Sequence, residues 1–273
     1  MIALLAASAY LTTLGLVLVR LSTIMVSGAW WFGQAAIPTQ AKFGLAFCLA
    51  LLVTPTLGTI VPPPSTMLDL AWLVVGEAVV GGTAGLVVGA VLSGLQLAGD
   101  IIDQQAGIAL GEVFNPATGD SMTVTGTFLI AVSTAALLAA EPFGLEERLL
   151  GGVLDSFKTL PPGSMVMPSL GPVGSGGLTD VLAALVQQAA VLAIRVAAPL
   201  MAVMAIVSLT LGTLGATVPQ VNVLVLGFAV RASVALAVIG LSLSPMMDVT
   251  LQTAFETVDT ALDVIQMMAP AGG

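Results

Sequence analysis

Long apolar runs separated by short polar breaks dominate this chain, and most of the runs are too long to be strands. Runs without a charged residue include Ile2–Val19, Phe43–Val61, Ser121–Ala140, Val196–Val230 and Ala232–Ser244. About 20 apolar residues of helix cross a bilayer core, so most of these runs could each span it. The longest run exceeds one span and contains proline and glycine, which predicts a helical hairpin with its turn near Gly215–Asn222. The pattern predicts an all-α fold with about six to eight apolar helices, some of them kinked.

Prolines mark where these helices are expected to end. The triple proline Pro62–Pro64 and Pro245 each interrupt an apolar run, because proline lacks the amide hydrogen that a continuing helix needs. Proline, glycine and serine are also concentrated in Pro161–Gly177, which is the clearest internal boundary. We therefore expect an N-terminal part over residues 1–165 and a C-terminal part over residues 178–273.

Two segments combine apolar and charged positions at helical spacing. Apolar residues recur along Leu145–Phe157 between Glu146, Glu147 and Arg148, which predicts an amphipathic helix at a surface or interface. The tail Met246–Met268 has apolar residues on one helical face and acidic residues on another. This pattern predicts an acidic amphipathic helix that is most often a solvated face.

Glycine recurs at every fourth residue in one apolar segment, at Gly81, Gly85 and Gly89. On a helix this spacing places the glycines on one face, where another backbone can approach closely. The face could serve packing within the chain or contact with another subunit, and the motif alone favours packing within the chain.

A polar stretch in the middle of the chain, Gln96–Thr123, interrupts the apolar pattern with acids, amides, glycines and Asn115-Pro116. Glycine permits unusual backbone angles, and the residue before a proline disfavours helix. We therefore expect a helix to end near Gln105 and a structured loop to follow. The loop is either a solvated connection or the lining of a water-filled path, and its residues alone favour the solvated connection.

Composition identifies the class of protein. Of the 273 residues, 58% are hydrophobic and 8% are charged, whereas soluble domains carry about 25% charged residues. With a mean hydropathy of +1.10, the chain is expected to be an integral membrane protein. A net charge of -9 makes nucleic acid an unfavourable partner. The single cysteine, Cys48, can form no disulfide within the chain.

A few ionisable residues lie within or beside the apolar helices. They are Arg20, Glu77, Asp100, Asp103, Arg195 and Arg231. Charge at bilayer depth costs at least about 2.5–3.5 kcal/mol on insertion scales, so such groups pair or face water. Structural pairing is favoured over a proton or substrate path. The sequence contains no histidine, nucleophile motif, phosphate loop or metal-spaced cluster, so we expect no enzyme activity, cofactor or metal.

Several segments, taken together and in order, resemble the FliR family, the flagellar members of a group that includes the SctT proteins of type III injectisomes. The matching pieces are LVLVRLSTIM, AIPTQAKFGLAFCLALLVTP, QLAGDIIDQQAGIALGEVFNPATG, LLGGVLDSFKTLPPG and LAIRVAAPLMAVMAIVSLTLGTLGATVPQVNVLVLGF. Two places depart from the family pattern. Glu141-Pro142-Phe143 replaces an Asn-Gly-His type of turn, and Ala229 stands where a proline is usual.

The resemblance implies a subunit of the flagellar protein export gate in the bacterial inner membrane, at the flagellar basal body. Such proteins assemble with FliP- and FliQ-like subunits, contact FlhB- and FlhA-like proteins, and pass unfolded flagellar proteins across the membrane. Their N-terminal part resembles a FliP subunit, and their C-terminal hairpin resembles FliQ. The alternatives are an SctT-type injectisome gate subunit and, less favoured, a standalone secondary transporter built on glycine-interrupted helices with embedded acids.

The resemblance also gives the middle stretch a role, because the corresponding loop of the family, here at about residues 106–120, plugs the central channel. Apolar side chains can close a pore by excluding water, and glycines can let a loop swing aside. The matching positions are Gly107, Ile108, Ala109, Leu110, Gly111, Glu112, Val113, Phe114, Asn115, Pro116, Ala117, Thr118 and Gly119. The resemblance therefore favours a plug over a solvated loop.

Overall fold

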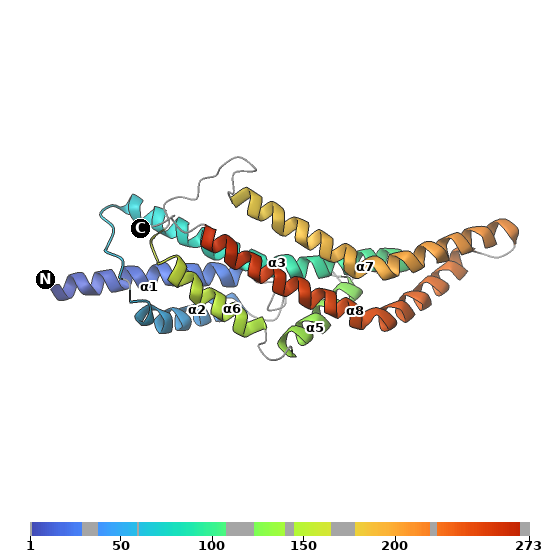
Figure 1. Ribbon diagram of the computed structural model, residues 1–273, viewed down its shortest axis with the longest axis horizontal. Helices are drawn as coiled ribbons and strands as arrows, with labels where there is room; N and C mark the ends of the chain where they lie inside the picture. Colours follow the sequence, from blue (N-terminus) through green and yellow to red (C-terminus); the bar gives the residue numbers. More distant parts are fainter. Residues whose placement is uncertain are drawn as a thin grey trace. The chain divides into compact units, whose positions relative to one another are not determined.

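The computed structural model describes residues 2–28, 38–58, 60–107, 123–139, 145–164, 178–218 and 223–267 (Figure 1). Every regular element within these ranges is a helix, which confirms the predicted all-α fold. The elements are α1 (Ile2–Ser27), α2 (Thr39–Val53), the short 3₁₀ helix η2 (Thr54–Thr56), α3 (Met67–Ala106), α5 (Val124–Ala139), α6 (Leu145–Thr159), α7 (Leu178–Thr217) and α8 (Val223–Met267).

Helix length and composition fit a membrane protein. Four stretches are long and apolar enough to cross a bilayer: Ala7–Ser27, Met67–Ala106, Thr179–Thr217 and Val225–Thr257. The end expected near Gln105 and the turn expected near Gly215–Asn222 agree with the helix boundaries at Ala106, Thr217 and Val223. These boundaries follow the glycines and prolines that the sequence places between apolar runs.

Two interior prolines do not end their helices. Pro199 lies inside the 40-residue helix α7, and Pro245 lies inside the 45-residue helix α8. The expectation that Pro245 separates an apolar run from a distinct tail is therefore wrong, because α8 continues through it to Met267. Long apolar helices tolerate an interior proline where neighbouring groups or local adjustments satisfy the freed carbonyl.

The chain forms two compact units that interleave along the sequence. Unit one contains Met1–Ala90, Pro142–Val186 and Phe255–Gly273, and unit two contains Val91–Glu141 and Gln187–Ala254. Three long helices, α3, α7 and α8, contribute residues to both units. The division into residues 1–165 and 178–273, drawn from local composition and the family resemblance, remains a prediction.

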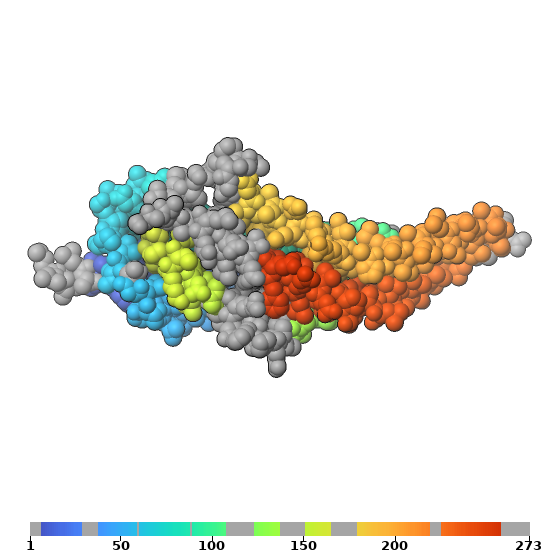
Figure 2. All heavy atoms as spheres, viewed as in Figure 1, coloured from blue at the N-terminus to red at the C-terminus, as the bar shows by residue number. Residues whose placement is uncertain are grey.

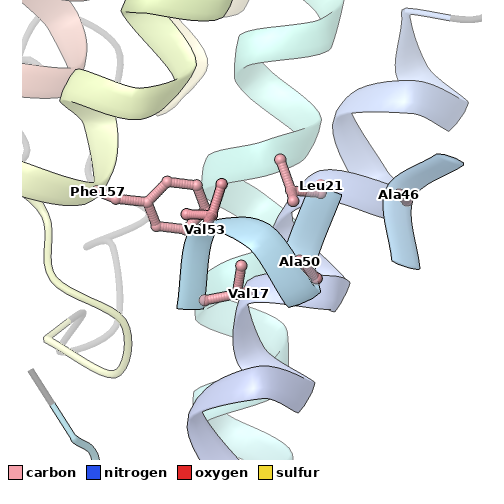
Figure 3. Close-up of a cluster of buried hydrophobic side chains, with 6 residues drawn as sticks. All are labelled: Val17, Leu21, Ala46, Ala50, Val53 and Phe157. Atoms are coloured by element: carbon pink, nitrogen blue, oxygen red, sulfur yellow. The ribbon is translucent and has the colours of Figure 1, made fainter. Parts of the chain in front are cut away.

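The core of unit one lies where α1, α2 and α6 meet (Figure 3). Its buried side chains are Val17, Leu21, Ala46, Ala50, Val53 and Phe157. The alanines present little side chain, so α2 can lie close against the larger residues of α1. The connector after η2 is held to the same helix, because the N–H of Val61 donates to the Thr13 hydroxyl at 2.9 Å.

Glycines of α3 allow close approach to α1 within unit one. A Cβ built on Gly85 would lie 2.6 Å from the carbonyl oxygen of Ile24, and a Cβ on Gly81 would overlap the carbonyl of Arg20. Gly89 is looser, because its Cβ would lie 3.6 Å from the nearest oxygen of α1. This geometry supports the predicted packing role of the stripe at its first two positions.

In unit two, α7 and α8 form an antiparallel hairpin whose visible surface is drawn in Figure 2. The helices touch where Gly227 faces Leu211, with 3.5 Å between a Cβ built on the glycine and the leucine side chain. Many large apolar side chains of this hairpin are exposed, among them Ile206, Leu209, Val225, Leu236 and Leu241. An apolar surface of this kind requires lipid or a protein partner to cover it.

Neighbouring glycines of α3 provide a matched test of the α1–α3 contact. A Cβ on Gly81 would overlap α1, whereas a Cβ on Gly82 meets nothing within 4 Å. Both Gly→Ala changes raise helix propensity equally, so only overpacking distinguishes them. We expect Gly81→Ala to destabilise the protein by about 1–3 kcal/mol relative to Gly82→Ala in unfolding titrations with sodium dodecyl sulfate. Equal stability of the two variants would show that the helices do not pack closely here.

Candidate functional site

A buried ion pair joins α1 to α3 in the middle of unit one. The Nε of Arg20 donates to Oε2 of Glu77 at 2.5 Å, and both side chains are 1% exposed. The second carboxylate oxygen of Glu77 accepts the N–H of Gly163 at 2.9 Å. Gly163 has a φ of 78°, which favours glycine, and this conformation forms part of the turn that brings its N–H to the carboxylate.

The rest of the Arg20 guanidinium is directed at α6. Its Nη1 donates to the carbonyl oxygens of Ser156 and Leu160 at 3.2 and 3.0 Å. These carbonyls lie at the C-terminal end of α6, which carries partial negative charge. The Ser156 carbonyl also accepts the backbone N–H of Leu160 at 2.9 Å. The guanidinium also lies 4.5 Å from the centre of the Phe157 ring, a favourable cation–π distance. Nη2 is buried and has no partner among the described residues.

Arg20 and Glu77 therefore connect three helices and the following turn. A buried guanidinium is tolerated only when its charge is paired and its N–H groups are largely satisfied. The arrangement leaves both carboxylate oxygens of Glu77 occupied. Its chemistry is that of a structural anchor and offers no free group for proton transfer.

The acids at the end of α3 make hydrogen bonds to the start of α5 in unit two. Asp103 is fully buried, and its Oδ2 accepts the N–H of Thr125 at 3.2 Å. Its Oδ1 accepts the hydroxyl of the same threonine. Asp100 is half-buried and accepts the hydroxyl of Thr123 at 3.0 Å. Both carboxylates are thus committed to hydrogen bonds across the segment that separates the two helices.

The remaining embedded charges are placed differently. Arg195 is exposed on α7. Arg231 is half-buried on α8, and its Nη2 donates a hydrogen bond to the hydroxyl oxygen of Ser208 at 3.5 Å. The structure therefore brings Arg20 together with Glu77 but leaves these two arginines in other surroundings.

Gly107 is the first residue of the predicted plug loop and its one member within the described ranges. It follows α3 with a φ of 78°, and a Cβ there would lie 3.2 Å from the ring of Phe228. Its N–H donates to the carbonyl of Gln104 at 3.3 Å. The other predicted plug positions, Ile108–Gly119, lie outside the described residues, as does Glu141-Pro142-Phe143.

Sequence reasoning missed the groups that hold the embedded charges. The partners of Arg20 at the end of α6 are backbone carbonyls. Any residue can supply a carbonyl, so no side-chain pattern predicts these partners. Thr123 did leave a signal, since threonine just before an apolar run is a helix N-cap signature. Within the described ranges, no three His, Cys, Asp or Glu side chains gather where they could hold a metal ion.

Comparison with known proteins identifies a family over most of the chain. The model of a family described as bacterial export proteins, family 1, matches residues 11–257. A flagellar biosynthetic protein FliR from Bacillus subtilis (strain 168) is 28% identical over 255 residues, covering 93% of this chain and 94% of that protein. A protein of the same name from Pectobacterium carotovorum subsp. carotovorum is 27% identical over 90% of this chain and 90% of its own length. One from Escherichia coli (strain K12) is 24% identical over 82% of this chain and 81% of its own length.

The buried ion pair predicts a strong dependence of stability on each partner. Glu77→Ala leaves the Arg20 charge buried without its counter-ion, and we expect a loss of about 3–5 kcal/mol in the free energy of unfolding. The double variant Arg20→Met, Glu77→Ala should lose less than the sum of the single changes, because no charge remains buried. Unfolding titrations of the three variants measure this coupling.

The exposed pair between Lys158 and Asp155 on α6, 2.7 Å apart, is the control. Asp155→Ala should cost at most about 1 kcal/mol, because solvent screens an exposed pair. Equal costs for Glu77→Ala and Asp155→Ala would contradict the anchoring role of the buried pair.

Proposed function

Because the chain belongs to the bacterial export proteins of family 1, we propose that it is a subunit of the flagellar type III protein export gate. The observation that carries this proposal is the family match over residues 11–257, together with relatives named flagellar biosynthetic protein FliR that align over nearly their whole length. An injectisome subunit is less favoured, because all the reported relatives carry the flagellar name.

The gate role gives the chain a membrane location and protein partners. We propose the inner membrane at the flagellar basal body, with FliP- and FliQ-like subunits as neighbours and FlhB- and FlhA-like proteins in contact. The cargo would be unfolded flagellar proteins, which are moved without chemistry by this chain. Four helices with the length and composition of membrane spans support the membrane location.

Exposed apolar helix faces support assembly with other subunits. In unit one, α2 exposes Phe43, Phe47 and Leu52. In unit two, Leu209 is 72% exposed and Leu236 is 71% exposed on the α7–α8 hairpin. Faces of this size and character are covered in a finished assembly by lipid or by helices of other chains. The faces are therefore where FliP- and FliQ-like subunits would bind.

We further propose that residues 107–119 form the plug of the gate. Ile108, Leu110, Val113 and Phe114 are the side chains that would exclude water from the closed pore. Gly107 supports a sharp change of direction at the end of α3, because its φ of 78° is one that glycine adopts readily.

A standalone transporter is a weaker candidate because of how Asp100 and Asp103 are hydrogen-bonded. Proton or ion coupling would need an acid with a free oxygen facing a path. Both oxygens of Asp103 are occupied by Thr125, and Asp100 accepts a hydrogen bond from Thr123. Asp103 therefore has no free oxygen for coupling, and one oxygen of Asp100 is engaged in the same contact between α3 and α5.

The gate proposal predicts two separable phenotypes in the organism that carries this chain. Deleting its gene should abolish the export of flagellar proteins, and returning the full chain should restore it. A chain that lacks Leu110–Pro116 should still assemble but should conduct small ions at rest, because the apolar seal is missing. Export assays and conductance of the purified complex in planar bilayers with potassium chloride measure the two effects.

Continued export in the gene deletion would contradict the gate role itself. Unchanged conductance of a complex that contains the shortened chain would contradict only the plug, and the gate role would stand.

A further inference from the structure

The end of α3 and the start of α5 are tied together by side chains on both sides of residues 108–122. Asp100 accepts the Thr123 hydroxyl at 3.0 Å. One turn later, Asp103 accepts both the N–H and the hydroxyl of Thr125, the former at 3.2 Å. We call these four residues the clasp. All of them belong to unit two.

The clasp supplies acceptors for two of the amide groups that the first turn of α5 leaves free. Helices begin with N–H groups that have no intrahelical acceptor. The N–H of Thr125 goes to Asp103, and the N–H of Gly126 goes to the Thr123 hydroxyl at 3.3 Å. A carboxylate at a helix N-terminus is also favoured by the helix dipole. These bonds explain how Asp103 can be completely buried as an acceptor.

The backbones of α3 and α5 approach closely beside the clasp. Gly99 on α3 lies against Gly126 on α5, so that a Cβ on Gly99 would overlap the backbone of Gly126. A Cβ on Gly126 would in turn lie 3.4 Å from the carbonyl oxygen of Gln96. Two glycines thus bring the helices near enough for short carboxylate and threonine side chains to meet.

We infer that Asp103 and Thr125, assisted by Asp100 and Thr123, are positioning residues that fix both ends of the segment proposed as the plug. The inference rests on the proposed function of that segment. Bringing the two ends of a segment together costs conformational entropy, and the hydrogen bonds of the clasp offset that cost. The clasp therefore determines where the segment leaves α3 and returns to α5.

Threonine variants test the clasp with little change in size. Thr125→Val replaces the hydroxyl by a methyl group, and Thr125→Ser restores the hydroxyl. Thr66→Val is the matched control, because Thr66 also binds the N-terminus of a helix, accepting the N–H of Asp69 at 3.1 Å, but is exposed. Each variant is assembled with its gate partners, and conductance in potassium chloride is normalised to the amount of complex. Amide hydrogen exchange is then measured over the first turn of α5.

We expect Thr125→Val to raise resting conductance and to speed exchange of the α5 amides, each by roughly tenfold, because a hydrogen bond to a buried charge is lost. Thr125→Ser and Thr66→Val should match the unmodified chain in both measurements. A variant that was merely less stable would yield less complex but no leak per complex.

Unchanged exchange in Thr125→Val would overturn the clasp. Faster exchange without a leak would overturn its positioning role, provided that the Leu110–Pro116 deletion does leak. If the complex with the Leu110–Pro116 deletion also shows unchanged conductance, the proposed plug is overturned, and with it the role given to the clasp.

Discussion

The burial of Arg20 is the constraint on which unit one depends. A guanidinium without solvent must have its charge and its N–H groups satisfied by the protein, and the penalty for losing one partner is several kcal/mol. Glu77 supplies the charge, the end of α6 supplies two carbonyls, and the Phe157 ring covers a face. Because these partners lie far apart in sequence, satisfying one side chain fixes α1, α3 and α6 together. The glycines of α3 then allow the close approach that the short ion-pair distance requires.

The same physical logic recurs in unit two with hydrogen bonds in place of an ion pair. Asp103 is buried and accepts two bonds from Thr125, so the start of α5 is fixed to the end of α3. A chain with only 8% charged residues thus uses its embedded acids and Arg20 as fixed points. The apolar surface left exposed on α2 and on the α7–α8 hairpin is then available for lipid and partner subunits.

Much of this fold could be predicted from the pattern of hydrophobic residues along the chain. Uncharged runs predicted the helices, and glycine and proline predicted the end of α3 and the turn between α7 and α8. Pro245 misled, because a proline in a long apolar helix can be accommodated by its surroundings, which the local sequence does not show. Apart from Glu77, the partners of Arg20 and Asp103 could not be predicted either. They are backbone groups or short side chains brought near by tertiary packing, so the sequence shows the charge without showing what satisfies it.

The most direct test of the gate role is the native mass of this chain after co-expression with FliP- and FliQ-like partners and purification in mild detergent. The apolar surfaces of α2 and the hairpin predict a stable mixed complex that contains this chain, with little free chain. A chain that purifies well folded but alone, with both partners present in the same membranes, would contradict the account. The exposed apolar faces would then be lipid-facing, and the assignment to the gate would fail.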